Sequence, residues 1–279
     1  MKLAFTTLGC PNWNLDKIIE KGVEYDYDGI DFRGYLGELD IYHYPEFSSN
    51  VKETVRKLQE ASLEVPCFSS SVRLFTKSKE EFEMYLEELK QYAWLCKEFN
   101  TPYIRVFGGS IGETSREEAF NIVENNVKRY LEIAEGNNIG LLFETHDDWT
   151  NCEYMKEVFL RISSPHFHVL WDVHHPYRTL GENPLTTIET LGKWMKYTHW
   201  KDSYVKKDTE RGYQLCLLGD GDVPLQNIYH LLKNNGYDGY YTLEWEKKWC
   251  PELVEPEVAF KQFITYMRNL QYFAEKGRV

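Results

Sequence analysis

The stretch IGLLFETH, residues 139–146, decides the fold, because three later stretches of the chain repeat its layout. It is an apolar run of strand length that ends in polar residues, and Gly136-Asn137-Asn138 marks a turn before it. The later stretches are FHVLWDVHHP (167–176), KYTHWKD (196–202) and GYYTLEWE (239–246). Apolar residues at consecutive positions are typical of parallel strands that are buried on both faces. The four stretches therefore predict adjacent strands of a parallel sheet.

Four further strand-like runs precede this stretch and alternate with helical segments. We expect strands at 2–7, 29–33, 64–70 and 102–107. We expect helices from about residue 14, at about 50–62, at 78–99, from Thr114 and at about 255–273. Thr114 and Glu117 have the spacing of a capping box at the start of their helix.

Eight strand–helix pairs in 279 residues give roughly 35 residues a pair, which suits βα units. The predicted fold class is therefore α/β, with a single (β/α)8 TIM-barrel domain over residues 1–279. An open doubly wound sheet is the alternative. No G-x-G-x-x-G follows the first strand, however, so the nucleotide signature usual in that fold is missing.

The composition counts against several classes of protein. The 32 basic and 44 acidic residues give a net charge of −12, which counts against a nucleic-acid partner. No apolar run approaches the roughly 18 residues of a membrane helix, and residues 1–5 do not resemble a secretory signal. None of the six cysteines forms a Cys-x-x-Cys pair, so we expect reduced thiols and a cytoplasmic protein.

A potential metal ligand ends each of the four repeated strands, at the end of the barrel where active sites lie. These residues are Glu144, Asp172, His199 and Glu244, at intervals of 28, 27 and 45 residues. The first two intervals equal one βα unit, and the third adds an insertion near residues 203–222. An unpaired carboxylate after a buried strand is costly, and a divalent cation removes that cost. Three carboxylates and one imidazole favour Mn²⁺, with Mg²⁺, Co²⁺ and Zn²⁺ as alternatives.

Other polar residues near the strand ends are candidates for substrate binding. His146 and Lys201 each follow a predicted ligand by two residues. Arg33 ends the second strand, and an ion pair with Asp31 or Glu38 is its alternative role.

Residues in the neighbouring loops extend this set. Arg178, in the loop after the sixth strand, would suit an anionic substrate. Trp13 could line an apolar wall for sugar carbons together with Trp200 and Trp245, and core packing is the alternative. Asp202 either contacts the substrate or pairs with Lys201.

Several motifs resemble the xylose-isomerase-like TIM-barrel superfamily of sugar phosphate isomerases and epimerases, over essentially the whole chain. They are FETH (143–146), WDVHHP (171–176), HWKD (199–202), GDGDVP (219–224) and LEWE (243–246). The resemblance implies that the four strand-end residues are the metal ligands. In the ketose 3-epimerase branch two metal-bound glutamates face the reacting carbon, which implies catalytic roles for Glu144 and Glu244. His175 matches a substrate-contacting histidine of that branch, whereas Val205 replaces its usual arginine.

The resemblance and the predicted site imply a metal-dependent isomerase or epimerase of a keto-sugar or polyol derivative. It would remove a proton next to a metal-bound carbonyl and pass through an enediolate. Loss of a β-hydroxyl instead would make it a dehydratase of a keto-inositol-like substrate. The superfamily also has an endonuclease branch, against which the net charge counts, and binding without turnover is a further alternative. We expect a small-molecule partner and no membrane partner, and a homo-oligomer stays open.

Overall fold

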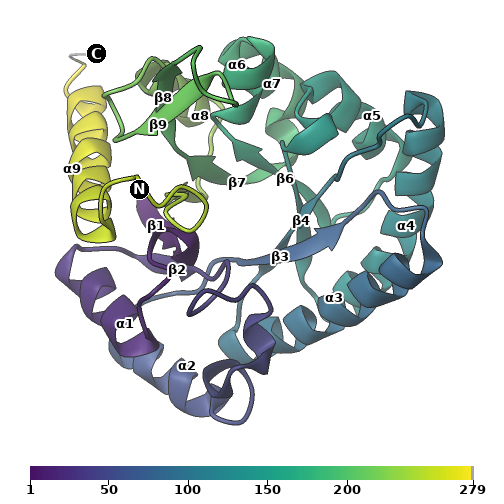
Figure 1. The fold of residues 1–279 in the computed structure, drawn as a ribbon, viewed down its shortest axis with the longest axis horizontal. Coiled ribbons are helices and arrows are strands. Elements are labelled where there is room, and N and C mark those ends of the chain that lie inside the picture. The colour runs from purple at the N-terminus through teal and green to yellow at the C-terminus, as the bar shows by residue number, and fades with distance from the viewer. Residues whose placement is uncertain (278–279) are drawn as a thin grey trace.

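The computed structural model describes residues 1–277 and shows eight parallel strands that curl into a barrel (Figure 1). In sheet order they are β2 (Gly29–Asp31), β1 (Lys2–Thr6), β10 (Tyr240–Leu243), β7 (Met195–Trp200), β6 (Phe167–Asp172), β5 (Gly140–Glu144), β4 (Tyr103–Phe107) and β3 (Phe68–Arg73). The edge strands β2 and β3 meet through parallel bridges between Gly29 and Glu64 and between Phe32 and Phe68. The predicted α/β class and (β/α)8 barrel are confirmed.

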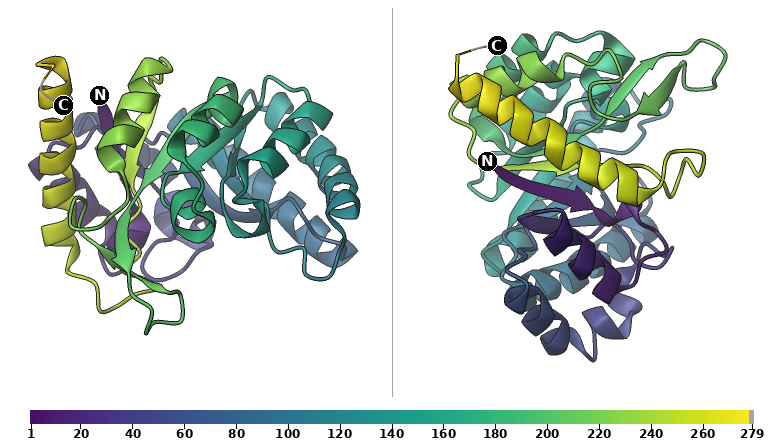
Figure 2. Two further views of the ribbon diagram at one scale, coloured as in Figure 1. Left: turned by 90° about the horizontal axis from the view of Figure 1, so that it is seen from above. Right: turned by 90° about the vertical axis from the view of Figure 1, so that its left-hand side faces the viewer.

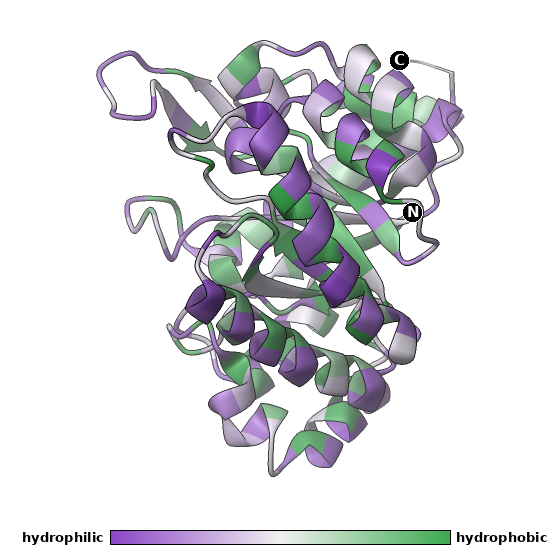
Figure 3. Ribbon diagram, turned by 90° about the vertical axis from the view of Figure 1, so that its right-hand side faces the viewer, coloured by the Kyte–Doolittle hydropathy of each residue, from purple (hydrophilic) through white to green (hydrophobic). Residues whose placement is uncertain are grey.

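Helices connect the strands, and most of them cover the outside of the barrel (Figures 1 and 2). They are α1 (Leu15–Glu24), α2 (Val51–Glu60), α3 (Lys79–Phe99), α4 (Arg116–Gly136), α5 (Cys152–Arg161), α6 (His175–Leu180), α7 (Pro184–Leu191), α8 (Leu225–Asn234) and α9 (Pro256–Glu275). The hydropathy colouring of Figure 3 shows hydrophobic residues on the helix faces toward the strands and hydrophilic residues outward. The last helix packs on the first strand, where the ring centroids of Phe260 and Phe5 are 4.5 Å apart.

Alternation along each strand separates the core from the barrel interior. In β5, Leu141 and Phe143 belong to the large cluster between strands and helices, whereas Leu142 belongs to a separate inner cluster. The inner cluster forms an apolar floor of six buried residues: Ala4, Cys67, Leu142, Leu170, Tyr197 and Tyr240. Because side chains two positions apart share a face, Glu144 lies above Leu142 on the inner face. The consecutive apolar residues of the sequence thus serve two cores, and polar residues follow above the floor.

The third strand differs from its predicted range. It begins at Phe68 rather than at Glu64, which takes part only in the isolated bridge with Gly29. Pro66 stands between the two positions and has no N–H group to donate to a strand ladder. The strand therefore starts later and extends to Arg73.

The start of α4 also differs from the prediction. The helix begins at Arg116, and the hydroxyl of Ser115 accepts its capping hydrogen bond from the Glu118 N–H group. Thr114 is one residue too early, because its own N–H group donates to the Ile111 carbonyl in the preceding turn at 3.0 Å.

The predicted insertion after the seventh strand is an antiparallel hairpin of β8 (Asp202–Val205) and β9 (Tyr213–Cys216). Figure 2 shows the hairpin and the loop after β10 projecting from the same face of the barrel. These two segments therefore flank the end of the barrel at which β7 and β10 finish. Across residues 1–277 no helix combines the length and the apolar composition that crossing a membrane requires.

Candidate metal centre and active site

The four predicted metal ligands come together at the carboxyl ends of their strands. They are Glu144 on β5, Asp172 on β6, His199 on β7 and Glu244, which directly follows β10. Each offers one ligand atom, and these atoms all lie within 4.8 Å of one another. All four side chains are buried, so the cluster lies inside the barrel above the apolar floor.

The ring of His199 is held between carboxylates on both sides. Its Nδ1 lies 2.9 Å from Glu144 Oε1 and 3.5 Å from Glu244 Oε1, and its Nε2 lies 3.3 Å from Asp31 Oδ2. Burial lowers the pKa of His199, but Glu244 and Glu144 outweigh burial and raise this pKa to about 10. A carboxylate on the outer nitrogen of a ligand imidazole fixes its orientation, which is the place that Asp31 occupies.

The carboxylates keep unsatisfied oxygens that suit a cation. Among residues 1–277, no group makes a hydrogen bond to Asp172 Oδ2 or to Glu144 Oε2, although both atoms are buried. Lys201 Nζ lies 2.8 Å from the first and Arg105 Nε 3.2 Å from the second, in each case without hydrogen-bond geometry. Burial raises the pKa of Glu144, but Arg105 and His199 hold this pKa below its usual range. The oxygen-rich donor set therefore fits a divalent cation.

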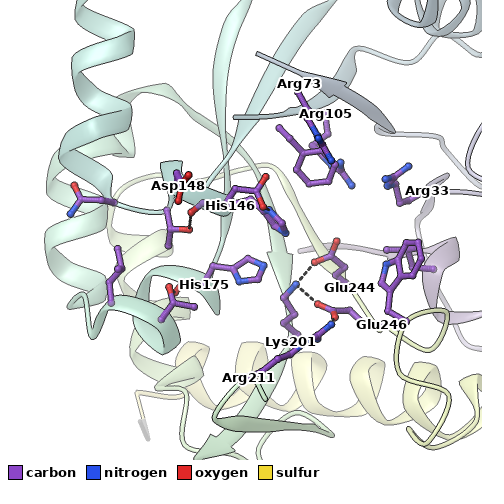
Figure 4. Close-up of a pocket in the computed structure, with 18 of the residues that line it drawn as sticks. Arg33, Arg73, Arg105, His146, Asp148, His175, Lys201, Arg211, Glu244 and Glu246 are labelled. Atoms are coloured by element: carbon purple, nitrogen blue, oxygen red, sulfur yellow. Dashed lines mark hydrogen bonds and ion pairs between the residues drawn. The ribbon is translucent and has the colours of Figure 1, made fainter. Parts of the chain in front are cut away.

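A cavity of about 1040 Å³ opens above the cluster, and Figure 4 shows the side chains that line it. The predicted residues among them are Arg33, His146, His175, Lys201 and Glu244. The hairpin also reaches the cavity, through Arg211 and Tyr213. The structure thus gathers most of the predicted substrate contacts around one space.

Lys201 lies among the carboxylates of Asp172, Glu244 and Glu246 on one side of the cavity, which we call the acidic side. Its ammonium group donates to Glu244 and, at 2.9 Å, to Glu246 Oε1 (Figure 4). Burial lowers the pKa of Lys201, but the neighbouring carboxylates of Asp172, Glu244 and Glu246 outweigh burial and raise this pKa. The lysine is therefore a charged donor fixed between carboxylates.

His146 and His175 form a pair on another side of the cavity, with ring centroids 4.6 Å apart. His146 Nδ1 lies 2.8 Å from Asp147 Oδ1. Burial lowers the pKa of His146, but the neighbouring carboxylates of Asp147 and Glu144 outweigh burial and raise this pKa. Burial, reinforced by Lys201, lowers the pKa of His175 well below its usual value. The pair thus combines a ring whose pKa is raised with one whose pKa is lowered.

Arg178 and Trp13 do not line this cavity, contrary to the prediction. The guanidinium of Arg178 donates to the Ser203 side chain and backbone, both at 2.8 Å, and pairs with Asp222. Its charge is therefore used to hold the hairpin. Trp13 is buried with its ring centroid 5.5 Å from that of Phe260, because its indole completes the core between α1 and α9.

Trp200 and Trp245 are also core residues rather than walls of the cavity. Both are buried, and their ring nitrogens donate to Thr198 Oγ1 at 2.9 Å and to the Val254 carbonyl at 3.0 Å. Hydrogen bonds of this kind let an indole ring lie in the core.

Asp202 does not line the cavity either. Its carboxylate accepts hydrogen bonds from backbone N–H groups at Ser203, Gly219, Gly221 and Val223. A Cβ atom at Gly221 would lie 2.1 Å from Asp202 Oδ1, so only glycine fits there. The GDGDVP motif thus wraps around Asp202 and anchors the hairpin to the barrel.

Four arginines of the cavity escaped the sequence-based prediction. They are Arg73, Arg105, Arg116 and Arg211. Arg105 did leave a signal, because it is a charged residue in the middle of the otherwise apolar β4 strand. Arg211 could not be found from spacing. Position 205, where the resemblance leads us to expect an arginine, holds a Val205 that is 55% exposed. Arg211 lies in the hairpin turn instead, and its Nη1 is 3.1 Å from Glu246 Oε2.

The sequence model of the xylose isomerase-like TIM barrel family matches residues 19–270. The chain belongs to this family. The family membership agrees with the closed barrel and with the ligand cluster at its carboxyl end.

Similar proteins of this family differ in their reactions. An inosose dehydratase of Clostridium botulinum is 22% identical in an alignment 304 positions long, which covers 97% of this chain and 96% of the dehydratase. A fructoselysine 3-epimerase of Escherichia coli O157:H7 is 22% identical over 191 residues, 66% of each chain. Both relatives are enzymes, but one name describes a lyase and the other an epimerase.

Solved structures support the fold. The structure of the IOLI protein with a bound zinc atom superposes with a TM-score of 0.80 and 18% identity, covering 97% of this chain and 98% of the other. At this level of identity the likeness concerns the fold, and the cluster geometry of this chain carries the argument for a metal.

Proposed function

We propose that this chain is a divalent-metal-dependent isomerase or epimerase that moves a proton next to a carbonyl of a keto-sugar or polyol derivative. One observation carries the proposal: Glu144 and Glu244 approach the same His199 nitrogen at 2.9 and 3.5 Å. Their strands β5 and β10 are separated by two others in the sheet. The two carboxylates therefore reach the centre from different sides, as the removal and return of a proton require.

Each side chain has a role in this reaction. Glu144, Asp172, His199 and Glu244 would hold the cation, which polarises a carbonyl as a Lewis acid and makes the adjacent C–H group more acidic. One of the two glutamates takes the proton. Its return to the other face of the same carbon inverts that carbon, and its delivery to the adjacent carbon isomerises the sugar. His146, His175, Lys201 and Arg33 bind substrate oxygens from the cavity wall.

We put Mn²⁺ first among the metals to test, because three of the four donors are carboxylates. Zn²⁺, Mg²⁺ and Co²⁺ complete the panel, and the zinc-bound structural neighbour supports including zinc. All six cysteines are free thiols, which supports our placement of the protein in the cytoplasm.

A dehydratase is the second candidate, and Lys201 is the observation that favours it. Elimination of a β-hydroxyl needs an acid that protonates the leaving oxygen. The ammonium group of Lys201 lines the cavity beside Glu244, which could remove the proton from the neighbouring carbon. The likeness to an inosose dehydratase across 97% of this chain supports the same reading.

Solvent exchange tests both candidates at once. Mn²⁺-loaded protein is incubated in deuterated water with ketohexoses and keto-inositols, and each recovered sugar is examined by mass spectrometry and NMR. An isomerase or epimerase returns a sugar with deuterium on carbon, and a dehydratase gives a product that has lost water and absorbs in the ultraviolet. Unchanged, undeuterated sugars throughout the panel, from protein shown to bind Mn²⁺, would contradict both candidates. Glu244→Gln, which replaces one of the two proposed proton-transfer carboxylates, should lose this activity. The exposed Glu87→Gln is its matched control.

A further inference from the structure

Three arginines reach one side of the cavity from neighbouring strands, in a chain whose net charge is −12. We call Arg33, Arg73 and Arg105 the arginine cluster; they lie two residues after β2, at the end of β3 and within β4. In Figure 4 the guanidinium groups of Arg33 and Arg105 lie on the side of the cavity away from Lys201 and Glu246. The cluster therefore faces the acidic side across the space in which a substrate would bind.

Among residues 1–277, the structure gives an acidic partner to one member of the cluster. Arg105 Nε lies 3.2 Å from Glu144 Oε2. Within residues 1–277, no carboxylate lies within 4.0 Å of the guanidinium nitrogens of Arg33 or Arg73. Asp31, the acidic residue two positions before Arg33, does not pair with Arg33 and instead lies against His199.

Arg33 is the decisive member because it is buried. Only 6% of it is exposed, and its Nη1 donates to the hydroxyl of Ser71 at 3.0 Å, a neutral acceptor. The nearby carboxylate of Glu88 is engaged by the Ser71 N–H group at 2.6 Å. Burial, with the charge of Arg105, lowers the pKa of Arg33 to about 10, so the guanidinium is still charged at neutral pH. A buried charge without a counter-charge is costly unless a ligand supplies one.

The cluster is contiguous and adjoins the metal centre. The guanidinium carbon of Arg105 lies 3.8 Å from the ring centroid of Phe107, and that of Arg33 lies 5.7 Å from the same centroid. Arg73 is exposed at the mouth of the cavity. Two of the arginines thus lie near the same ring, and one of these two also lies 3.2 Å from a proposed metal ligand.

We propose that the arginine cluster binds an anionic group of the substrate, so that the protein acts on a sugar acid or a sugar phosphate rather than on a neutral sugar. The planar guanidinium fork matches the paired oxygens of a carboxylate or a phosphate. Arg33 and Arg73 contact the anion, while Arg105 adjoins both the anion and Glu144. The word substrate rests on the proposed function, but the binding of the anion does not require turnover.

Binding of three six-carbon probes tests the proposal. Isothermal titration of the Mg²⁺-loaded protein compares D-fructose, which is neutral, with 5-keto-D-gluconate, which carries a carboxylate, and D-fructose 6-phosphate. We expect at least one anion to bind about 10-fold or more tightly than fructose. Arg33→Gln and Arg73→Gln should each weaken anion binding about 10-fold, and each should weaken the binding of the anion more than the binding of fructose. Arg129→Gln, an exposed change on α4, is the control.

The outcomes separate the possibilities. Tighter binding of the keto acid identifies a carboxylate, and tighter binding of the sugar phosphate identifies a phosphate. Equal affinity for all three probes, or anion binding that survives both substitutions, overturns the proposal. Because Arg33 is buried, thermal melting checks its variant, and the exposed Arg73→Gln keeps the test valid if that variant fails to fold.

These titrations, combined with the solvent-exchange experiment on the same three probes, distinguish this proposal from the proposed function. Arginine-dependent anion binding without deuterium exchange in any probe would refute the proton transfer and leave the anion site standing. Deuterium exchange into fructose without any preference for anions would refute only the anion site.

Discussion

The two halves of the barrel mouth carry opposite charges on the same scaffold. Strands β5, β6 and β7 and the residue after β10 supply three carboxylates and an imidazole that meet within 4.8 Å. Strands β2, β3 and β4 supply the arginine cluster of Arg33, Arg73 and Arg105. The acids are drawn to one point, whereas two of the arginines stand without a carboxylate in residues 1–277. The difference supports our proposals that a metal ion binds in one half and an anionic group of the substrate in the other.

Arg105 joins the two halves, because its Nε lies 3.2 Å from Glu144 Oε2. Side chains alternate between the inner and outer faces along each strand of a barrel, so position along the strand decides which face a side chain takes, whatever its charge. The chemistry of each half is therefore a matter of which residue occupies the inner position above the floor. The following predictions test whether the two halves have the separate roles assigned to them.

The largest effect is expected from the acidic half, at Glu244. Glu244→Gln should lower turnover by about 10³-fold, because the amide cannot exchange a proton with carbon. The same change should weaken metal binding less than His199→Ala, which removes a ligand atom from the centre. Turnover and Mn²⁺ titrations measure the two quantities, with Glu87→Gln as control. Normal turnover in Glu244→Gln would remove this residue from the chemistry.

Cutting the link between the halves should cost stability. Arg105→Met leaves the buried Glu144 without its neighbouring cation, and we expect the free energy of unfolding to fall by about 3 kcal/mol in metal-free protein. A bound divalent cation supplies the missing charge, so the loss should shrink when Mn²⁺ saturates the site. Urea unfolding with and without Mn²⁺ measures the difference. An equal loss in both conditions would mean that Arg105 acts by packing alone.

Asp31 lies on a strand of the arginine half but serves the acidic half. Asp31→Asn should weaken metal binding by about 10- to 100-fold, because the carboxylate that orients His199 is lost. The exposed Asp16→Asn on α1 is the matched control. Calorimetric titration with Mn²⁺ measures both variants, and unchanged affinity in Asp31→Asn would show that the imidazole is held by other contacts.

The smallest effect concerns Glu88, behind the arginine cluster. Burial raises the pKa of Glu88 from its usual 4.5 to about 7, and Asp40 adds to the rise while Ser71, Arg33 and Arg105 oppose it. A raised pKa means that the folded state favours the protonated carboxyl. The contribution of Glu88 to stability is therefore greatest below pH 4.5 and is lost as the pH rises through 7.

Glu88→Gln cannot ionise but keeps an acceptor for the Ser71 N–H group. We therefore expect the variant to lose less stability than the original protein between pH 5 and pH 8, by about 2 kcal/mol. Urea unfolding at the two pH values measures this difference. If both proteins lose the same free energy of unfolding between the two pH values, the ionised carboxyl of Glu88 is already stabilised by other groups or by water.

Much of the fold and the ligand set could be predicted from the chain alone. The apolar runs with a polar last residue mark strands and place Glu144, Asp172 and His199 at their carboxyl ends. Local signals also suffice for helix starts such as Asn14, whose side chain accepts the Lys17 N–H group at 3.0 Å. These features depend on periodicities of two and 3.6 residues, which are properties of one segment at a time.

Which charges meet across the barrel was decided only by the tertiary structure. Asp31 and His199 are 168 positions apart, and Arg105 and Glu144 meet because neighbouring strands pair in one register. The same holds for Arg178, which binds the hairpin, and for Asp202, which the GDGDVP loop encloses. A segment's own pattern states which face a side chain takes, but its partner depends on the strands and loops that fold against that face, and these come from distant parts of the chain.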